Sequence, residues 1–246
     1  MKRARRTFNA DWEREARNWI AWARTPGHDS YWEYSPAFFE IVPAPGRVTL
    51  EIGCGEGRVA RDLADRGHHV SGIDASPTLI EAAREADPGR DYQVAEAAAL
   101  PFEAGAFDLV VAYNSLMDIE DMSGAVREAA RVLTDRGRLC ICLLHPMASA
   151  GRFESREPEA PFVISGSYLE SRRVVEQFAR DGLEITFHFW CRPLEAYTRA
   201  LEQAGLVIEC LREPAQPPVA GNIVEARWRR LPLFLFLRAV KAPRGS

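Results

Sequence analysis

Residues 48–64 read VTLEIGCGEGRVARDLA, and they change from apolar to glycine-rich to helical in character within one short segment. A strand, a glycine turn and a helix together form the usual cradle for a nucleotide-like ligand, because glycine lets the ligand approach the backbone closely. The glycines are Gly53, Gly55 and Gly57, whereas a dinucleotide-binding G-x-G-x-x-G loop needs its third glycine at the position of Arg58. This spacing argues against a nicotinamide dinucleotide.

A carboxylate accompanies the loop, since Glu51 lies between Leu50 and Ile52 directly before it. A pyrophosphate beside Glu51 would be repelled, whereas a ligand with ammonium and sulfonium groups would be attracted. S-adenosylmethionine carries both groups. Asp74 ends the next apolar segment, where an acid can accept hydrogen bonds from both ribose hydroxyls. The position of Asp74 alone would suit NAD equally well.

Around this segment, apolar runs alternate with amphipathic ones. The alternation predicts an α/β doubly wound, seven-stranded, mostly parallel sheet with helices on both faces. The expected strands are 47–52, 68–74, 91–97, 107–113, 137–145, 206–213 and 232–241, and the expected helices between them are 57–67, 76–86, 123–134 and 193–205. Ser76 is expected to cap its helix, with Pro77 at the first helical position.

Two segments lie outside this alternation, and we expect both to cover the sheet within a single domain of residues 1–246. Residues 1–45 form an N-terminal cover, with a helix over 7–24 and an aromatic-rich, partly helical segment over 30–42. Residues 147–190 form a lid insertion, in which 147–163 reads as loop and 172–179 and 183–190 read as two strands around an Asp-Gly turn.

Composition restricts the function classes. The net charge of −4 gives no basic field for nucleic acid, and the start MKRARR reads as a solvated tail. No apolar run reaches membrane-span length and no signal peptide follows the first charges, so we expect a cytoplasmic protein without a membrane partner. Five cysteines without metal-ligand spacing indicate reduced core thiols, and the acids of the segment MDIEDM, Asp118, Glu120 and Asp121, read as helix caps rather than a magnesium site.

Four segments carry a resemblance to a known family. LEIGCGEGRVARDLA (50–64), VSGIDAS (70–76), AEAAALPFEAGAFDLVVA (95–112) and RVLTDRGRLCICLLHP (131–146) resemble successive motifs of the class I S-adenosylmethionine-dependent methyltransferases, in the small-molecule branch. The likeness covers about residues 48–146 and continues over 192–214. It implies that the final strand inserts antiparallel into the sheet.

The resemblance also assigns cofactor contacts. The methionine part would lie on Glu51 and on the loop Gly53, Cys54, Gly55 and Gly57; the ribose on Asp74; and the adenine on Ala75, Ser76, Glu96 and Ala97. Glu96 stands where relatives usually have Asp. Tyr113 and Asn114 would lie near the methionine end and the reaction centre. Tyr31 or Trp32, in the aromatic segment SYWEY, would close over the cofactor or else belong to a core aromatic cluster.

Two histidines are candidate catalytic residues. His145 ends the fifth strand, where it would act as a general base or else bond to the local backbone. His188 shares a strand face with Trp190, and the two side chains would cover the substrate or simply pack.

These observations predict methyl transfer from S-adenosylmethionine to a small molecule, with oxygen favoured over nitrogen or carbon. The alternatives are a nicotinamide-dependent oxidoreductase, a non-catalytic S-adenosylmethionine-binding protein, and an enzyme that keeps the cofactor site but catalyses cyclisation or isomerisation. The sequence leaves the oligomeric state open.

Overall fold

The structure is a computed structural model that describes residues 8–215 and 223–242. The basic start MKRARR lies outside the described residues. The main sheet consists of β1 (Thr49–Ile52), β2 (Val70–Asp74), β3 (Asp91–Val94), β4 (Phe107–Tyr113), β5 (Leu133–Leu144), β10 (Leu206–Arg212) and β11 (Phe234–Lys241). The helices are α1 (Phe8–Arg24), α2 (Tyr31–Phe39), α3 (Arg58–Asp65), α4 (Pro77–Ala86), α5 (Met122–Val132), α6 (Pro146–Ala150), α7 (Leu194–Gln203) and the 3₁₀ helix η1 (Ile223–Arg229).

The seven strands of the main sheet lie in the order β10-β11-β5-β4-β1-β2-β3. Strands β1 to β5 are parallel, whereas β11 pairs antiparallel with both β5 and β10. The predicted fold class and the antiparallel final strand are therefore confirmed. The strand order reverses between β1 and β4, and parallel sheets bind their ligands at the carboxyl ends of the strands beside such a reversal.

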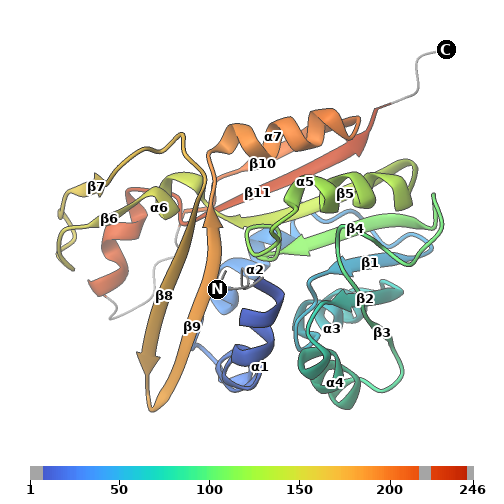
Figure 1. Cartoon of the computed structure of the whole chain (residues 1–246), viewed down its shortest axis with the longest axis horizontal. Coiled ribbons are helices and arrows are strands. Elements are labelled where there is room, and N and C mark those ends of the chain that lie inside the picture. Colours follow the sequence, from blue (N-terminus) through green and yellow to red (C-terminus); the bar gives the residue numbers. More distant parts are fainter. Residues whose placement is uncertain (1–7, 216–222, 243–246) are drawn as a thin grey trace, which may run out of the picture.

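Helices cover both faces of this sheet (Figure 1). Successive side chains of a strand point to opposite faces, and β4 shows this clearly. Val110 and Ala112 belong to the core cluster that contains α5 and α7, whereas Leu109 and Val111 belong to the cluster that contains α2, α3 and α4. All four side chains are buried, as expected for a strand that is apolar throughout.

The predicted helix starts around the glycine loop are observed. Ser76 caps α4, because its Oγ accepts a hydrogen bond from the Leu79 backbone N–H at 3.2 Å and Pro77 follows at the first helical position. Gly57 precedes α3 with φ of 84°, a left-handed conformation that favours glycine.

The 147–190 insertion is more ordered than the sequence predicts. Its first part was expected to be loop, but it contains α6 and a short hairpin of β6 (Gly151–Phe153) and β7 (Phe162–Ile164). The loop prediction is wrong because an aromatic contact closes this polar segment: the Phe153 ring lies 5.1 Å from Phe162 and 5.0 Å from Trp228 of η1.

The second part of the insertion is the predicted hairpin. Strands β8 (Arg172–Arg180) and β9 (Leu183–Cys191) pair antiparallel around the turn at Asp181 and Gly182. The hairpin extends away from the main sheet and runs beside α1 (Figure 1). At its tip, the Arg180 guanidinium donates hydrogen bonds to the carbonyls of Gly27 and His28, so the insertion is attached to the loop that follows α1.

The structure also bears on two expectations from composition. All five cysteines are buried and free of disulfides. Within residues 8–215 and 223–242, no helix combines the length and the apolar character needed to cross a membrane.

Candidate functional site

A cavity of about 900 Å³ lies at the carboxyl ends of β1, β2 and β4. Its floor consists of the loops that follow these strands, and its walls come from α1, α2, the 147–190 insertion and η1. The volume is at the upper end of the range of about 300–1,000 Å³ typical of small-molecule sites, which leaves room for two small ligands.

The glycine loop forms part of the floor and is held against β2. The backbone N–H groups of Gly53 and Cys54 both donate to the Ile73 carbonyl, at 2.8 and 2.9 Å. Gly53 has φ of 69°, and a Cβ added there would lie 2.4 Å from the Cβ of Ser115. The Ser115 hydroxyl donates to the Ile52 carbonyl at 2.7 Å, so the loop after β4 packs directly on the glycine loop.

Asp74 connects the glycine loop to the end of β2. One carboxylate oxygen accepts from the Gly55 backbone N–H at 2.9 Å, and the other accepts from the Ser76 N–H at 2.9 Å. Burial raises the pKa of Asp74, although these backbone hydrogen bonds oppose the shift. The carboxylate lines the cavity, where it can accept a further hydrogen bond from a ligand hydroxyl.

Glu51 is the most deeply placed acid of the floor. It is 1% exposed, and its Oε2 atom has no hydrogen-bond partner. Burial raises the pKa of Glu51 well above its usual range, and the neighbouring Asp74 and Glu56 raise it further. A buried carboxylate among other acids is stabilised in its charged form by a cation, so this end of the cavity suits a positively charged ligand.

Asp118 is a further cavity carboxylate, which sequence reasoning treated as a cap. In the structure Asp121 is the residue that caps α5, with Oδ1 accepting from the Gly124 N–H at 2.8 Å. Asp118 lines the cavity instead, and its carboxylate makes no hydrogen bond within the described residues. Burial and the nearby Asp74 raise its pKa, and Arg192 opposes the shift. The position of Asp118 just after β4, beside the strand-order reversal, was the sequence signal that could have indicated its place in the cavity.

Helix α1 lies across the part of the floor that contains Ser76 and Glu96. Glu13 accepts hydrogen bonds from the hydroxyls of Ser76 and Thr78, and Asn9 donates to Glu96 at 2.6 Å. Glu96 therefore lines the cavity with one oxygen engaged by the cover. Sequence reasoning missed Asn9 and Glu13, because nothing local to α1 indicates what it packs on.

Tyr31 is held at the cavity wall by several contacts. Its hydroxyl donates to Asp62, the Arg58 guanidinium lies 4.0 Å from its ring centroid, and the Tyr113 ring lies 5.3 Å away. Trp32 is 46% exposed and is not among the cavity-lining residues. Of the two aromatic residues proposed to close over the cofactor, Tyr31 is therefore the one that the fold places at the cavity.

The two histidines are placed away from the cavity lining. His145 caps α6: Nδ1 accepts from the Met147 N–H at 3.1 Å, and Nε2 lies 3.0 Å from the Glu213 carboxylate. Burial lowers the pKa of His145, although Glu213 opposes the shift. His188 lies 3.8 Å from Asp11 of α1, while its strand neighbours Phe187 and Phe189 line the cavity.

The fold brings most of the predicted cofactor residues together. Those that line the cavity are Tyr31, Glu51, Gly53, Cys54, Gly55, Asp74, Ala75, Ser76, Glu96, Ala97, Tyr113 and Asn114. Those that do not are Trp32, Gly57, His145 and His188. Within residues 8–215 and 223–242, no group of three or more His, Cys, Asp or Glu side chains is arranged to hold a metal ion.

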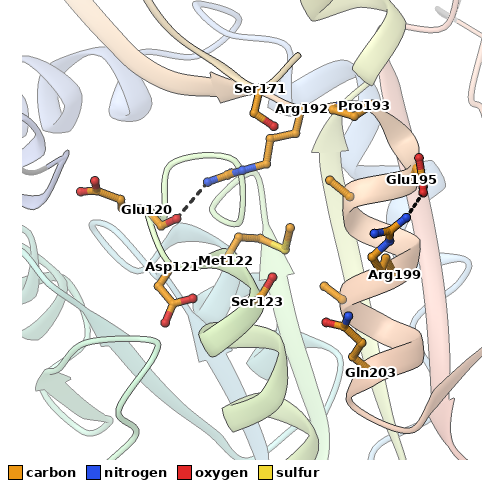
Figure 2. Close-up of a pocket in the computed structure, with 12 residues that line it drawn as sticks. Glu120, Asp121, Met122, Ser123, Ser171, Arg192, Pro193, Glu195, Arg199 and Gln203 are labelled. Atoms are coloured by element: carbon orange, nitrogen blue, oxygen red, sulfur yellow. Dashed lines mark hydrogen bonds and ion pairs between the residues drawn. The ribbon is translucent and has the colours of Figure 1, made fainter. Parts of the chain in front are cut away.

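A second hollow, of about 400 Å³, lies between the starts of α5 and α7 (Figure 2). Its charged groups are engaged internally: Arg192 donates to the carbonyls of Ile119 and Glu120 at 2.7 and 3.2 Å, and Arg199 pairs with Glu195. None of the predicted site residues lines it, so the chemistry is assigned to the larger cavity.

The residues of that cavity fit S-adenosylmethionine. The Oε2 atom of buried Glu51 has no hydrogen-bond partner, although Arg61 lowers the pKa of this carboxyl, and Gly53 and Gly55 line the cavity beside it with backbone alone. Together with the antiparallel insertion of β11, this floor gives the chain a Rossmann-like fold of the doubly wound α/β class.

Comparisons with known proteins agree with this fold and with this cofactor. Residues 50–141 match the family described as "Methyltransferase domain". The chain is 27% identical to a demethylmenaquinone methyltransferase from Thermotoga maritima over 185 residues, which are 65% of this chain and 80% of that protein. It is 34% identical to a ubiquinone biosynthesis O-methyltransferase from Xanthomonas axonopodis pv. citri over 123 residues, 48% of this chain and 50% of that protein.

A solved structure extends the likeness to most of the fold. An S-adenosylmethionine-dependent methyltransferase from Mesorhizobium loti superposes with a TM-score of 0.66 at 23% identity, covering 86% of this chain and 98% of that one. Residues 50–141 therefore belong to the class I S-adenosylmethionine-dependent methyltransferases, an enzyme family that uses S-adenosylmethionine as its cofactor.

Proposed function

We propose that the protein transfers a methyl group from S-adenosylmethionine to an oxygen atom of a small-molecule acceptor. The observation that carries this proposal is the buried Glu51 carboxylate beside the glycine loop, whose Oε2 atom has no hydrogen-bond partner, in a cavity at the strand-order reversal of a methyltransferase fold. The names of the two relatives, which concern menaquinone and ubiquinone synthesis, support a small-molecule acceptor, and one of them specifies oxygen.

The residues that would hold the donor follow from the floor of the cavity. Glu51 and the glycine loop would hold the methionine part, Asp74 the ribose, and Glu96 with the Ala97 backbone the adenine. When bound, the donor supplies a methyl group on a positively charged sulfur, which needs no further activation. The chain must therefore orient an acceptor, exclude water and, for a hydroxyl acceptor, take up a proton.

Asp118 is our candidate for the general base that takes up this proton. It lines the cavity, its carboxylate has no hydrogen-bond partner in the described chain, and its raised pKa makes it a better proton acceptor than an ordinary carboxylate. Water exclusion would come from the cavity-lining aromatic side chains of the cover and the insertion. Trp12, Trp19 and Phe187 form one such cluster, with ring centroids 6.0 to 6.2 Å apart.

A turnover assay tests this function. The full chain is incubated with S-adenosylmethionine that carries a deuterated methyl group and with a panel of hydroxylated, aminated and carbon-nucleophile acceptors. The proposal expects S-adenosylhomocysteine to accumulate and one hydroxylated acceptor to gain the labelled methyl on oxygen, as located by mass spectrometry and NMR. Tight S-adenosylhomocysteine binding without turnover on any acceptor would support a non-catalytic binding protein instead.

The nicotinamide-dependent alternative predicts a different binding profile. An oxidoreductase would bind NADH and leave S-adenosylhomocysteine unbound. The cytoplasmic location, the single-domain organisation and the absence of nucleic-acid and membrane partners remain predictions from the sequence.

A further inference from the structure

The two ends of the cavity differ in charge. The floor is acidic, with Glu51, Asp74 and Asp118 close to one another. We use the term outer wall for the cavity-lining residues of the insertion and η1. Its charged members are Arg152, Arg156, Arg180 and Arg227 against Glu154 and Glu176. The wall therefore carries an excess of positive charge that faces an acidic floor.

The outer wall is also rich in aromatic side chains. Phe153 and Trp228 pack edge to face, with ring centroids 5.0 Å apart and an interplanar angle of 89°. Phe178 and Phe187 form a second pair, 5.5 Å apart at 75°. These pairs come from different segments of the chain, and aromatic walls of this kind bind flat apolar rings by contact with their faces and edges.

Arg227 combines both features. Its guanidinium lies 5.5 Å from the Phe153 ring centroid, and one terminal nitrogen donates to the Ser155 carbonyl at 2.9 Å. Its Nε atom is buried and has no hydrogen-bond partner. A buried guanidinium N–H without an acceptor is unfavourable, because the group has lost its water and gained no partner. The fork of an arginine matches a carboxylate, which would supply that acceptor.

The neighbouring arginines add to the positive charge of the wall, although Arg180 forms an ion pair with Asp181 at 3.5 Å. Arg152 and Arg156 line the cavity and are exposed, and neither side chain makes an ion pair or hydrogen bond in the described chain. Arg180 is engaged by the carbonyls of Gly27 and His28. An anionic ligand would therefore be attracted towards Arg227 and repelled from the acidic floor, whereas the cationic donor would be held at the floor.

We propose that the acceptor is a planar aromatic compound with a carboxylate substituent, whose ring lies against the aromatic pairs of the outer wall and whose carboxylate binds Arg227. This inference rests on the proposed function, because it assigns the second substrate of the same cavity. It names Arg227 as a specificity-determining residue. The reacting hydroxyl would be on the part of the ring directed to the floor.

A binding series on the full chain, loaded with S-adenosylhomocysteine, tests this inference. The probes are a hydroxynaphthoate, the matching hydroxynaphthamide and the matching naphthol, titrated by calorimetry. The proposal expects the carboxylate to bind about tenfold or more tightly than the amide, the size expected for one charge-assisted pair. Equal affinities for the acid and the amide would overturn it, even if S-adenosylhomocysteine binds and the proposed function stands.

Two variants test whether the preference for the carboxylate depends on Arg227. Arg227→Gln should remove the preference for the carboxylate while the affinity for S-adenosylhomocysteine stays unchanged. Arg229→Gln is the matched control, because Arg229 lies in the same 3₁₀ helix but does not line the cavity. A preference that survives Arg227→Gln, or that Arg229→Gln removes equally, would contradict the assignment. Failure of S-adenosylhomocysteine to bind the wild type would instead refute the proposed function.

Discussion

The Asp74 carboxylate accepts a hydrogen bond from the backbone N–H of Gly55 at 2.9 Å, and this bond ties the glycine loop after β1 to the end of β2. The loop is consequently shaped before any ligand arrives. Preorganisation of this kind lowers the entropic cost of binding, because fewer backbone torsions have to be ordered.

Gly53→Ala should disrupt the loop. The added Cβ would lie 2.4 Å from the Cβ of Ser115, on backbone with φ of 69°. Gly105→Ala is a matched control, since Gly105 has φ of 71° and open space around it. Left-handed backbone costs a non-glycine residue about 1–2 kcal/mol in either variant, so any larger fall in the free energy of unfolding at Gly53 reports the clash. Equal falls in denaturant melts of the two variants would contradict the loop geometry.

The buried acids predict an unusual pH dependence of stability. The pKa of Glu51 is raised above its ordinary value of 4.5, so the folded chain keeps a proton that the unfolded chain releases. The free energy of unfolding should therefore fall as pH rises from about 4.5 through the raised pKa. Glu51→Gln should flatten part of this decline, whereas Glu103→Gln, at an exposed position, should leave it unchanged. Melting temperatures across that pH range provide the measurement.

The same shift predicts proton release when the cofactor binds. A cation at the floor favours the ionised form of Glu51, so the donor should bind more tightly as pH rises through the same window. Calorimetry in buffers of different ionisation enthalpy counts the released protons. Release should shrink in Glu51→Gln; proton uptake by the wild type would show that the sign of this argument is wrong.

Asp118→Asn should lower turnover by about 100-fold, as expected for loss of a general base, while S-adenosylhomocysteine affinity changes little. The wild-type pH profile of kcat should show an ionisation that the variant lacks. Glu120→Gln is the control, because Glu120 lies in the same loop and does not line the cavity. If affinity for S-adenosylhomocysteine fell in parallel with turnover, Asp118 would be a binding residue rather than the proton acceptor.

His145→Ala tests the catalytic role first proposed for that histidine. Because both ring nitrogens already have partners in Met147 and Glu213, the variant should lose about 1 kcal/mol of stability and retain its turnover. Denaturant melts and initial rates report the two effects separately. A large loss of kcat at unchanged stability would restore His145 as a catalytic candidate.

Much of the core fold could be predicted because its signals are local. The apolar run of β4 predicts a buried strand, and the glycine loop predicts a tight turn. Ser76 followed by Pro77 predicts the start of a helix. The resemblance to a known family then supplied the antiparallel final strand, which periodicity alone does not determine.

The parts of the site that escaped prediction depend on contacts between distant segments. Strand alternation correctly placed His188 and Trp190 on one face, but only the packing of β9 shows that Phe187 and Phe189 take the cavity side. The hairpin that was expected to be loop is closed by Trp228, which lies far along the chain from Phe153.

The cover of the floor escaped prediction for the same reason. The contacts of α1 with Ser76 and Glu96 span more than 60 residues of sequence. Asp118 was equally ambiguous, because a carboxylate near a helix start reads as a cap until the neighbouring Asp121 is seen to fill that role.

Calorimetric titration of the full chain with S-adenosylhomocysteine, and separately with NADH, tests the central claim most directly. The account predicts saturable binding of S-adenosylhomocysteine, no heat with NADH, and weaker binding by about tenfold or more in Glu51→Gln. Binding of NADH without binding of S-adenosylhomocysteine would contradict the assignment of the cavity.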